Sequence, residues 1–260
     1  MLTAIVLTFD EADHLPDCLA SLAWADEVVV FDSFSTDGTV DIAREAGARV
    51  LQHPFENYAA QRNAALDAVP EAEWVLFVDA DERIPPALAE EVREVIRAGE
   101  VVAGWIPRHN YIFGKLTLGA GWFPDYQLRL LRRGKVRYDP ARGVHEVALV
   151  DGPQAHLIQP LIHLNYATVP EFVAKQRRFA AMDARTLFGL GHRARPQNYV
   201  LQPLRQFWWR YAQLNGWRDG WHGLCLCLWM AYFQGVLYRE LKALEKSAPL
   251  SKNLTGLQDL

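Results

Sequence analysis

The first hundred residues alternate between short apolar runs and segments with helical spacing, and this alternation constrains the fold more than any other feature. The apolar runs cover residues 2–8, 28–31, 49–52 and 74–78. Helical patterns lie between and after them: Leu15, Leu19 and Leu22, then 39–46, 58–68 and 87–96. Runs that are apolar throughout indicate strands buried on both faces. We therefore predict an α/β protein with a mainly parallel central sheet flanked by helices.

The pattern changes twice further along the chain. Over residues 101–166 the strands are shorter, Gly and Pro interrupt them, and aromatic and basic side chains interleave. Beyond Pro170 the spacing is helical over 171–187, 203–214 and 220–245, with Pro196 and Gly216 as breaks. We expect three segments: 1–100, 101–195 as the second half of the same domain, and a helical C-terminal extension over 196–260.

Composition excludes several classes of function. A formal net charge of -4 provides no basic field, so nucleic acid is not expected as a partner. Cys18, Cys225 and Cys227 are too few and too unevenly spaced for a disulfide framework or a zinc site, which favours a reducing, cytoplasmic setting. No run reaches the roughly 20 apolar residues that span a bilayer.

An acidic turn, Asp79-Ala80-Asp81-Glu82, directly follows the fourth apolar run. Neighbouring carboxylates that point the same way repel each other unless a cation lies between them. Mg²⁺ and Mn²⁺ prefer oxygen ligands and commonly combine one or two carboxylates with phosphate oxygens. Asp81 and Asp79 are therefore candidate ligands of a divalent metal that holds a diphosphate. The alternative is a solvated turn that caps the next helix.

Polar residues also follow the first two apolar runs, where ligands of a parallel sheet bind. Asp32 could accept a hydrogen bond from a base N–H, and Thr8 and Glu11 could line the same pocket. For Asp37 and Gly38 a helix cap and an eased turn are the simpler interpretation.

As an ordered set, these motifs resemble the family 2 glycosyltransferases, which have the GT-A fold. The matching pieces are Thr8-Phe9-Asp10-Glu11, Asp32 with Ser35-Thr36-Asp37-Gly38-Thr39, Gln61-Arg62-Asn63-Ala64-Ala65-Leu66, and Val78-Asp79-Ala80-Asp81-Glu82. The family usually has Asn where this chain has Asp10. The resemblance implies that residues 1–100 bind a nucleotide sugar, most simply a UDP-sugar. It also implies that Thr8, Glu11 and Asp32 hold the nucleoside, that Arg62 lies near the nucleotide, that Asp79 faces the ribose and that Asp81 ligates the metal. Phe9 is a further candidate for substrate binding.

The second half is similar to a narrower branch, the bacterial enzymes that extend the lipopolysaccharide inner core. The matching pieces are Gln127-Leu128-Arg129-Leu130-Leu131-Arg132-Arg133, Gly143-Val144-His145-Glu146, His163-Leu164-Asn165-Tyr166 and Gly216-Trp217-Arg218-Asp219-Gly220. This resemblance implies that residues 101–195 bind a glycolipid or surface-polysaccharide acceptor.

The family resemblance further implies an inverting, single-displacement reaction, which needs a carboxylate to take the proton of the acceptor hydroxyl. Glu146 is the first candidate and Asp125 the second, although Glu146 could instead pair with Arg142 or Arg129. Arg129 could bind a phosphate or anchor the mixed sheet. His145 and His163 could each approach the metal or the diphosphate, or serve as structural residues.

The C-terminal segment combines many aromatic residues with arginine and lysine around a short apolar helix. This combination suits a peripheral element on the cytoplasmic face of the inner membrane, and equally suits buried packing or a homodimer interface. Two other functions stay open: a polyprenyl-phosphate glycosyltransferase and a non-enzymatic, membrane-associated binding module. A nucleotidyltransferase is disfavoured because the loop after the first apolar run is acidic rather than basic and rich in glycine.

Overall fold

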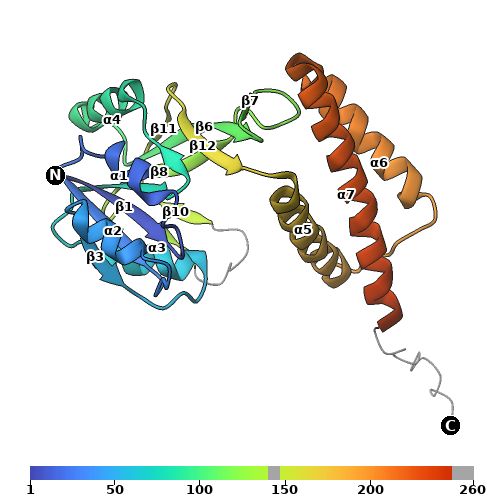
Figure 1. Ribbon diagram of the computed structural model, residues 1–260, viewed down its shortest axis with the longest axis horizontal. Helices are drawn as coiled ribbons and strands as arrows, with labels where there is room; N and C mark the ends of the chain where they lie inside the picture. The colour runs from blue at the N-terminus through green and yellow to red at the C-terminus, as the bar shows by residue number, and fades with distance from the viewer. Residues whose placement is uncertain (140–146, 248–260) are drawn as a thin grey trace, which may run out of the picture. The chain divides into compact units, whose positions relative to one another are not determined.

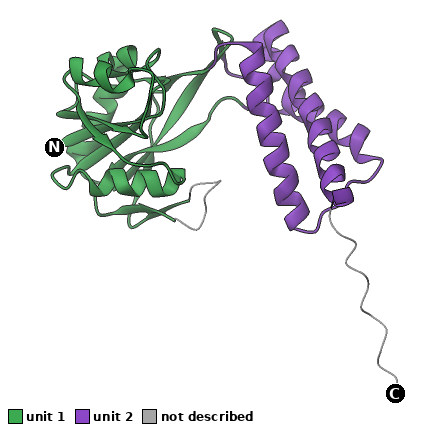
Figure 2. Cartoon of the chain, turned by 60° about the horizontal axis from the view of Figure 1, so that its bottom comes forward, with its two compact units in different colours: residues 1–116, 122–165 green, residues 117–121, 166–260 purple. Residues whose placement is uncertain are grey.

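The structure is a computed structural model that describes residues 1–139 and 147–247 (Figure 1). The chain divides into two compact units (Figure 2). The first contains residues 1–116 and 122–165, and the second contains residues 117–121 and the chain from Tyr166 onward. Because these units are defined by packing alone, the three functional segments that the sequence suggests stay a prediction.

The N-terminal half of the first unit is a parallel sheet. Strand β1 (Leu2–Thr8) lies between β2 (Glu27–Asp32) and β4 (Trp74–Asp79), and β3 (Arg49–Gln52) pairs with the outer edge of β2. All three pairings are parallel, so the carboxyl ends of β1, β2 and β4 meet at one edge. Polar residues that follow these strands are thereby gathered from distant parts of the sequence.

The sheet continues beyond β4 with antiparallel strands. Strand β8 (Tyr126–Arg132) pairs with β4, followed by β6 (Ala103–Ile112), β12 (Leu161–Tyr166) and the short β5 (Glu82–Arg83). Strands β7 (Lys115–Thr117) and β11 (Gln154–His156) pair with β6. Strands β9 (Val136–Tyr138) and β10 (Ala148–Val150) form a separate ribbon. Strands β6, β8 and β12 therefore lie beside the acidic turn.

Helices cover the two faces of this sheet. They are α1 (Leu15–Ala20), α2 (Thr39–Glu45), α3 (Tyr58–Asp67) and α4 (Pro86–Ala98). Side chains alternate along a strand, so Val6 joins the core under α1 and α4, while its neighbour Ile5 joins the core under α3. Both are fully buried, and each such side chain stabilises the fold by about 1.5–3 kcal/mol. This burial on both faces explains why the strands were recognisable as continuous apolar runs.

The second unit is helical, as predicted. It contains α5 (Val169–Gly189), α6 (Asn198–Trp208), a π-helical turn (Trp209–Gln213), a 3₁₀ turn (Gly216–Asp219) and α7 (Gly220–Ser247). One difference is that Pro203 lies inside α6 rather than at its start. Its ring faces Gly235 of α7, where a Cβ would lie 3.8 Å from Pro203 Cγ, so close helix packing accounts for its position. No helix within residues 1–139 and 147–247 is long and apolar enough to cross a membrane.

The motif over residues 216–220 forms a tight corner in this unit. The carboxylate of Asp219 accepts hydrogen bonds from the backbone N–H groups of Leu118 at 3.3 Å and Gly119 at 2.7 Å. A Cβ added to Gly223 would lie 2.0 Å from the carbonyl oxygen of Gly216, so only glycine fits at position 223. This motif therefore fastens residues 117–121 to the start of α7.

Overall, the predicted α/β class is confirmed, including the flanking helices and the C-terminal helical region. Each of the four predicted apolar runs lies in a strand, and each predicted helix of the first hundred residues overlaps an observed one.

Candidate functional site

The acidic turn after β4 is held by a buried arginine from the neighbouring strand. Arg129 on β8 donates from Nη1 to Asp79 Oδ1 at 3.1 Å and from Nη2 to both Asp79 Oδ2 and Glu82 Oε1. The other oxygen of Glu82 accepts the backbone N–H of Asp79 at 3.0 Å. Arg129 is 3% exposed and Glu82 is completely buried. One guanidinium thus fixes two carboxylates at the end of β4.

This arrangement shifts the pKa of all three groups. Burial alone would raise the pKa of Asp79, but Arg129 and Arg62 hold it far below its usual range. Burial raises the pKa of Glu82, and Arg129 offsets only part of that effect. Burial alone would lower the pKa of Arg129, whereas Asp79 and Glu82 hold it well above its ordinary value. Asp79 therefore stays ionised, with both of its oxygens facing arginine.

Asp81 faces a histidine instead. Its Oδ2 lies 3.3 Å from Nε2 of His163, which comes from β12. The backbone N–H of Leu164 donates to the Asp81 carbonyl oxygen at 2.9 Å, so the turn and β12 are held side by side. The fold thus brings the carboxylate of Asp81 and the imidazole of His163, which are distant in sequence, next to each other at this edge of the sheet.

A buried asparagine fixes a proton on one ring nitrogen of His163. Asn110 on β6 donates from Nδ2 to the Trp122 carbonyl oxygen at 2.8 Å and to Asp125 Oδ2 at 3.2 Å, so its Oδ1 is the acceptor. That oxygen lies 2.7 Å from His163 Nδ1 and also accepts from Asn165 Nδ2. Nδ1 of His163 consequently carries a hydrogen, and Nε2 faces Asp81.

These two residues have the donor chemistry of a divalent-cation site. Within residues 1–139 and 147–247 no group of three or more His, Cys, Asp and Glu side chains could hold a metal ion. Mg²⁺ and Mn²⁺ sites in nucleotide-binding enzymes commonly use only one or two protein ligands, with phosphate oxygens and water completing the set. A carboxylate of Asp81 with an oriented imidazole of His163 fits such a site. Asp79, the other predicted ligand, has its oxygens engaged by Arg129.

Asp125 lies on the other side of the same asparagine. Arg108 on β6 donates to its Oδ2 from Nε at 2.8 Å and from Nη2 at 2.6 Å, and Gln127 donates to its Oδ1 at 2.9 Å. Burial alone would raise the pKa of Asp125, but Arg108, Asn110 and Gln127 lower it. Asp125 is thus ionised at neutral pH, and its Oδ1 has one protein donor and room for a second.

The carboxyl ends of β1 and β2 form the opposite side of the predicted donor site. Asp32 is completely buried and accepts four hydrogen bonds: from Thr8 Oγ1, from the backbone N–H and Oγ of Ser35, and from Gln52 Nε2. All four acceptor positions of the carboxylate are used by the protein. The structure thereby places Asp32 beneath the turn that follows β2.

Two exposed phenylalanines stand at these strand ends. Phe9 is 61% and Phe34 is 53% exposed, each at the end of a buried strand. The loops that carry them are tied together, because Asp10 Oδ1 accepts the backbone N–H of Thr36 at 2.7 Å and the backbone N–H of Asp10 donates to Ser35 Oγ at 2.9 Å. An Asp in place of the usual Asn is tolerated at position 10 because its side chain acts as an acceptor.

Of the remaining predicted site residues, the structure describes Arg62 and Glu11 but not His145 and Glu146. Arg62 of α3 lies over the rings of Phe77 and Tyr138, with Nη2 3.6 Å from Asp79 Oδ1. The backbone N–H of Glu11 donates to Thr39 Oγ1 at 2.9 Å. Glu146 and His145 lie outside the described residues. Sequence reasoning missed Asn110 and Arg108, since neither belongs to a motif and only the packing of β6 beside β8 and β12 shows their partners.

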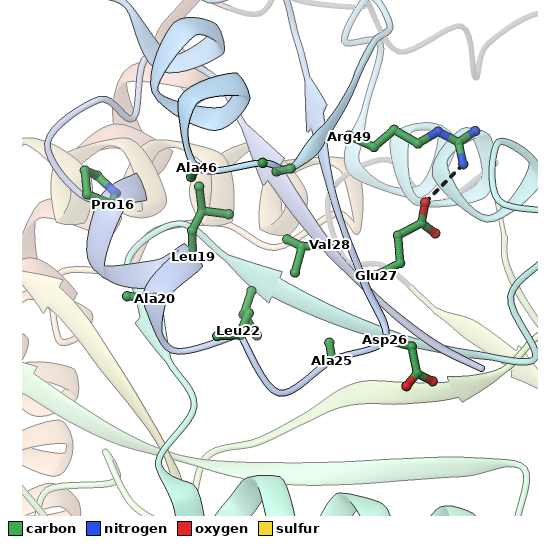
Figure 3. Close-up of a pocket in the computed structure, with 13 residues that line it drawn as sticks. Pro16, Leu19, Ala20, Leu22, Ala25, Asp26, Glu27, Val28, Ala46 and Arg49 are labelled. Carbon is green, nitrogen blue, oxygen red and sulfur yellow. Dashed lines mark hydrogen bonds and ion pairs between the residues drawn. The ribbon is translucent and has the colours of Figure 1, made fainter.

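A pocket of about 570 Å³ lies at the other edge of the parallel sheet (Figure 3). Its lining includes the residues that begin β2 and β3, together with Leu19 and Leu22 near α1. Glu27 and Arg49 form an ion pair at its rim. The pocket is therefore at the amino ends of β2 and β3, away from the carboxyl-end site, and its charged lining residues are Asp26, Glu27 and Arg49.

The sequence matches the family model described as Glycosyl transferase family 2 over residues 3–147. The lipopolysaccharide core biosynthesis glycosyltransferase LpsC of Rhizobium meliloti (strain 1021) is 31% identical over 234 residues, covering 85% of this chain and 84% of LpsC. An uncharacterized glycosyltransferase of Rickettsia bellii (strain RML369-C) is 36% identical over 95 residues, which are 36% of this chain and 32% of that protein. Crystalline S. aureus TarS 1–349 aligns with a TM-score of 0.46 and 18% identity, covering 94% of this chain and 91% of that chain.

Proposed function

This chain belongs to glycosyl transferase family 2, as its motifs predict, and we propose that it moves a sugar from a nucleotide-diphosphate donor, most simply a UDP-sugar, to a glycolipid or surface-polysaccharide acceptor with inversion. The single observation that carries the proposal is the linked set of Asp81, His163 and Asp125 around Asn110. Similarity to LpsC over most of both chains supports an acceptor of the lipopolysaccharide-core type.

Asp81 and His163 would hold a divalent cation, Mg²⁺ or Mn²⁺, at the donor diphosphate. When bound, such a cation supplies positive charge that favours departure of the nucleoside diphosphate. His163 is oriented for this role because Asn110 keeps its Nδ1 protonated and its Nε2 toward Asp81. Asp79 would act at the ribose edge, within the arginine framework of Arg129 and Arg62.

Asp125 would take the proton of the acceptor hydroxyl. Its lowered pKa keeps it ionised, and Arg108 and Asn110 hold Oδ2 so that Oδ1 is the oxygen with a remaining acceptor position. The hydroxyl oxygen then forms the new bond to the anomeric carbon as the bond to the nucleoside diphosphate breaks. Glu146 is the competing base, and His145 would contribute to substrate binding. Arg129, which is buried between Asp79 and Glu82, would act by positioning these two carboxylates.

The nucleoside would lie over the tied ends of β1 and β2. Phe9 offers an exposed ring there, while Thr8 and Asp32 support the turn from below. An exposed ring beside a pocket can stack on a base through its face. Glu11, at the start of the next turn, would line the same pocket.

Titration calorimetry with UDP and Mn²⁺ tests the metal site. We expect Asp81→Ala to lose the metal-dependent part of UDP binding, while Asp41→Ala, which removes an exposed carboxylate on α2, binds as wild type does. Unchanged metal-dependent binding by Asp81→Ala would refute the site.

Turnover of a panel of nucleotide sugars, read as UDP release and product mass, tests the base. We expect Asp125→Asn to lower kcat by about 10²–10⁴ while donor binding is retained. Glu146→Gln is measured in parallel: if it alone abolishes turnover, the base is Glu146 and our assignment of Asp125 is wrong. Supplying a polyprenyl phosphate beside a glycolipid acceptor separates the two acceptor classes.

A further inference from the structure

Helix α6 exposes an apolar stripe to solvent. The stripe consists of Val200, Leu201, Leu204 and Trp208, whose exposures lie between 59% and 63%. At 100° per residue these positions fall within about one third of the helix circumference. The opposite side of the helix packs on α7, where the Tyr199 hydroxyl donates to the Tyr238 carbonyl oxygen. No residue of α6 is buried, so the stripe has no cover from the part of the second unit that the structure describes.

The chain around this stripe is strongly basic. Between Asp183 and Glu240 the sequence contains seven arginines, and Asp219 is its single acidic residue. The carboxylate of Asp219 is itself engaged by two backbone N–H groups of residues 117–121. Arg193, Arg195 and Arg205 are all exposed, and Glu245 of α7, which accepts the backbone N–H of Ala194, offsets part of their charge. This local excess of positive charge stands against a formal net charge of -4 for the whole chain.

The positive charge beside the stripe favours an anionic lipid surface over a second copy of the chain as its binding partner. A second copy of the chain would bring like-charged arginines together, which disfavours association. An anionic lipid surface complements the arginines, and its interfacial region accepts the apolar side chains. Exposed tryptophans at positions 208, 209, 217 and 221 add the ring type that prefers the membrane–water interface. Apolar residues on one face with arginine beside them are the composition of an interfacial helix.

We propose that the α6 stripe is a binding site for a bilayer with anionic headgroups: Val200, Leu201, Leu204 and Trp208 enter the interfacial region, while Arg195 and Arg205 contact phosphates. The inference rests on the proposed function only for its biological setting, a membrane that carries the acceptor. The binding itself needs neither donor nor metal, so it can fail or succeed independently of glycosyl transfer.

Sedimentation of the full chain with vesicles tests this site. We expect binding to vesicles that contain phosphatidylglycerol, weakening as salt rises because headgroup charges are screened, and little binding to pure phosphatidylcholine. Leu204→Asp should weaken binding by at least about tenfold, since it removes an apolar anchor and adds a charge that the lipid repels. Arg205→Glu changes the charge by two units and should weaken binding by roughly 25-fold, from about fivefold per unit of charge near the surface.

Two variants in the first unit serve as matched controls. Leu149→Asp replaces a leucine that is 61% exposed, compared with 60% for Leu204, and Arg97→Glu reverses an exposed arginine on α4. Both should bind vesicles as wild type does. Absence of vesicle binding by wild type, or equal loss in Leu204→Asp and Leu149→Asp, would overturn the proposal. A dimer in sedimentation velocity that Leu204→Asp dissociates, without any vesicle binding, would assign the stripe to a second copy.

Discussion

Replacing Asp32 by Asn removes the charge of a completely buried carboxylate while keeping its shape. In the protein, Oδ1 accepts from Thr8 and Ser35 hydroxyls, and Oδ2 accepts from the Ser35 backbone N–H and Gln52 Nε2. An amide keeps one acceptor oxygen for the two N–H donors, and its NH₂ group faces the two hydroxyls, which then no longer donate to a carboxylate. Two hydrogen bonds to a charged group are lost, at about 1.5–3 kcal/mol each. The free energy of unfolding should therefore fall by about 3–6 kcal/mol at neutral pH.

The size of this loss should depend on pH. Burial alone would raise the pKa of Asp32, but hydrogen bonds from Ser35, Gln52 and Thr8 lower it below 3.8. A carboxyl whose pKa is lower in the folded state adds stability above its unfolded pKa, and that stability is lost as pH falls through the folded value. The difference between wild type and Asp32→Asn should stay constant at neutral pH and narrow only as the pH falls below 3.8.

Urea denaturation followed by circular dichroism measures both effects, with UDP calorimetry on the same samples. Asp41→Asn is the control because it neutralises an exposed carboxylate on the next helix, and it should leave the free energy of unfolding within about 0.5 kcal/mol of wild type. If Asp32→Asn is equally stable, the four hydrogen bonds do not hold the turn. Loss of UDP binding in such a stable variant would instead assign Asp32 to the nucleoside.

Two further predictions concern the buried ion cluster and the corner of the helical unit. Arg129→Met leaves Asp79 and Glu82 without their shared guanidinium and should lower the free energy of unfolding by about 3–5 kcal/mol in urea titration. A loss under about 1 kcal/mol would contradict the buried pairing. Asp219→Ala removes the acceptor of the Leu118 and Gly119 amides, and hydrogen exchange at Gly119 should quicken by about tenfold, as expected for one charge-assisted hydrogen bond. Unchanged exchange at that amide would show that Asp219 does not fasten the segment.

The parallel half of the sheet could be predicted from sequence because its central strands β1 and β4 are apolar on both faces. Ile5 and Val6 illustrate this, since neighbours in one strand enter the cores on opposite sides of the sheet. The acidic turn was also readable, because a carboxylate pair directly after a buried strand must lie at the ligand-binding edge. Both inferences use only local order along the chain.

The direction in which Asp79 points could not be predicted in the same way. Strand β8 runs antiparallel to β4 with Leu130 opposite Leu76, and this register brings Arg129 beside the end of β4. A shift of one residue would turn Arg129 to the other face of the sheet. No residue close to the acidic turn in sequence specifies that register. The sequence therefore predicts both Asp79 and Asp81 as metal ligands, whereas in the structure Asp79 faces Arg129 and Asp81 faces His163.

The role of Asn110 is the hardest to predict from sequence, because partners from other strands and loops use all the hydrogen-bonding capacity of its side chain. Its amide donates to Asp125 and to the Trp122 carbonyl oxygen, and its oxygen accepts from His163 and Asn165. An aspartate there would set a second carboxylate against Asp125, and an apolar residue would leave buried donors without acceptors. Asp125 and His163 are therefore linked through one side chain, which donates to the carboxylate and accepts from Nδ1 of the imidazole. In the reaction proposed above, this link would fix the carboxylate that takes the acceptor proton relative to the imidazole beside the donor before either substrate binds.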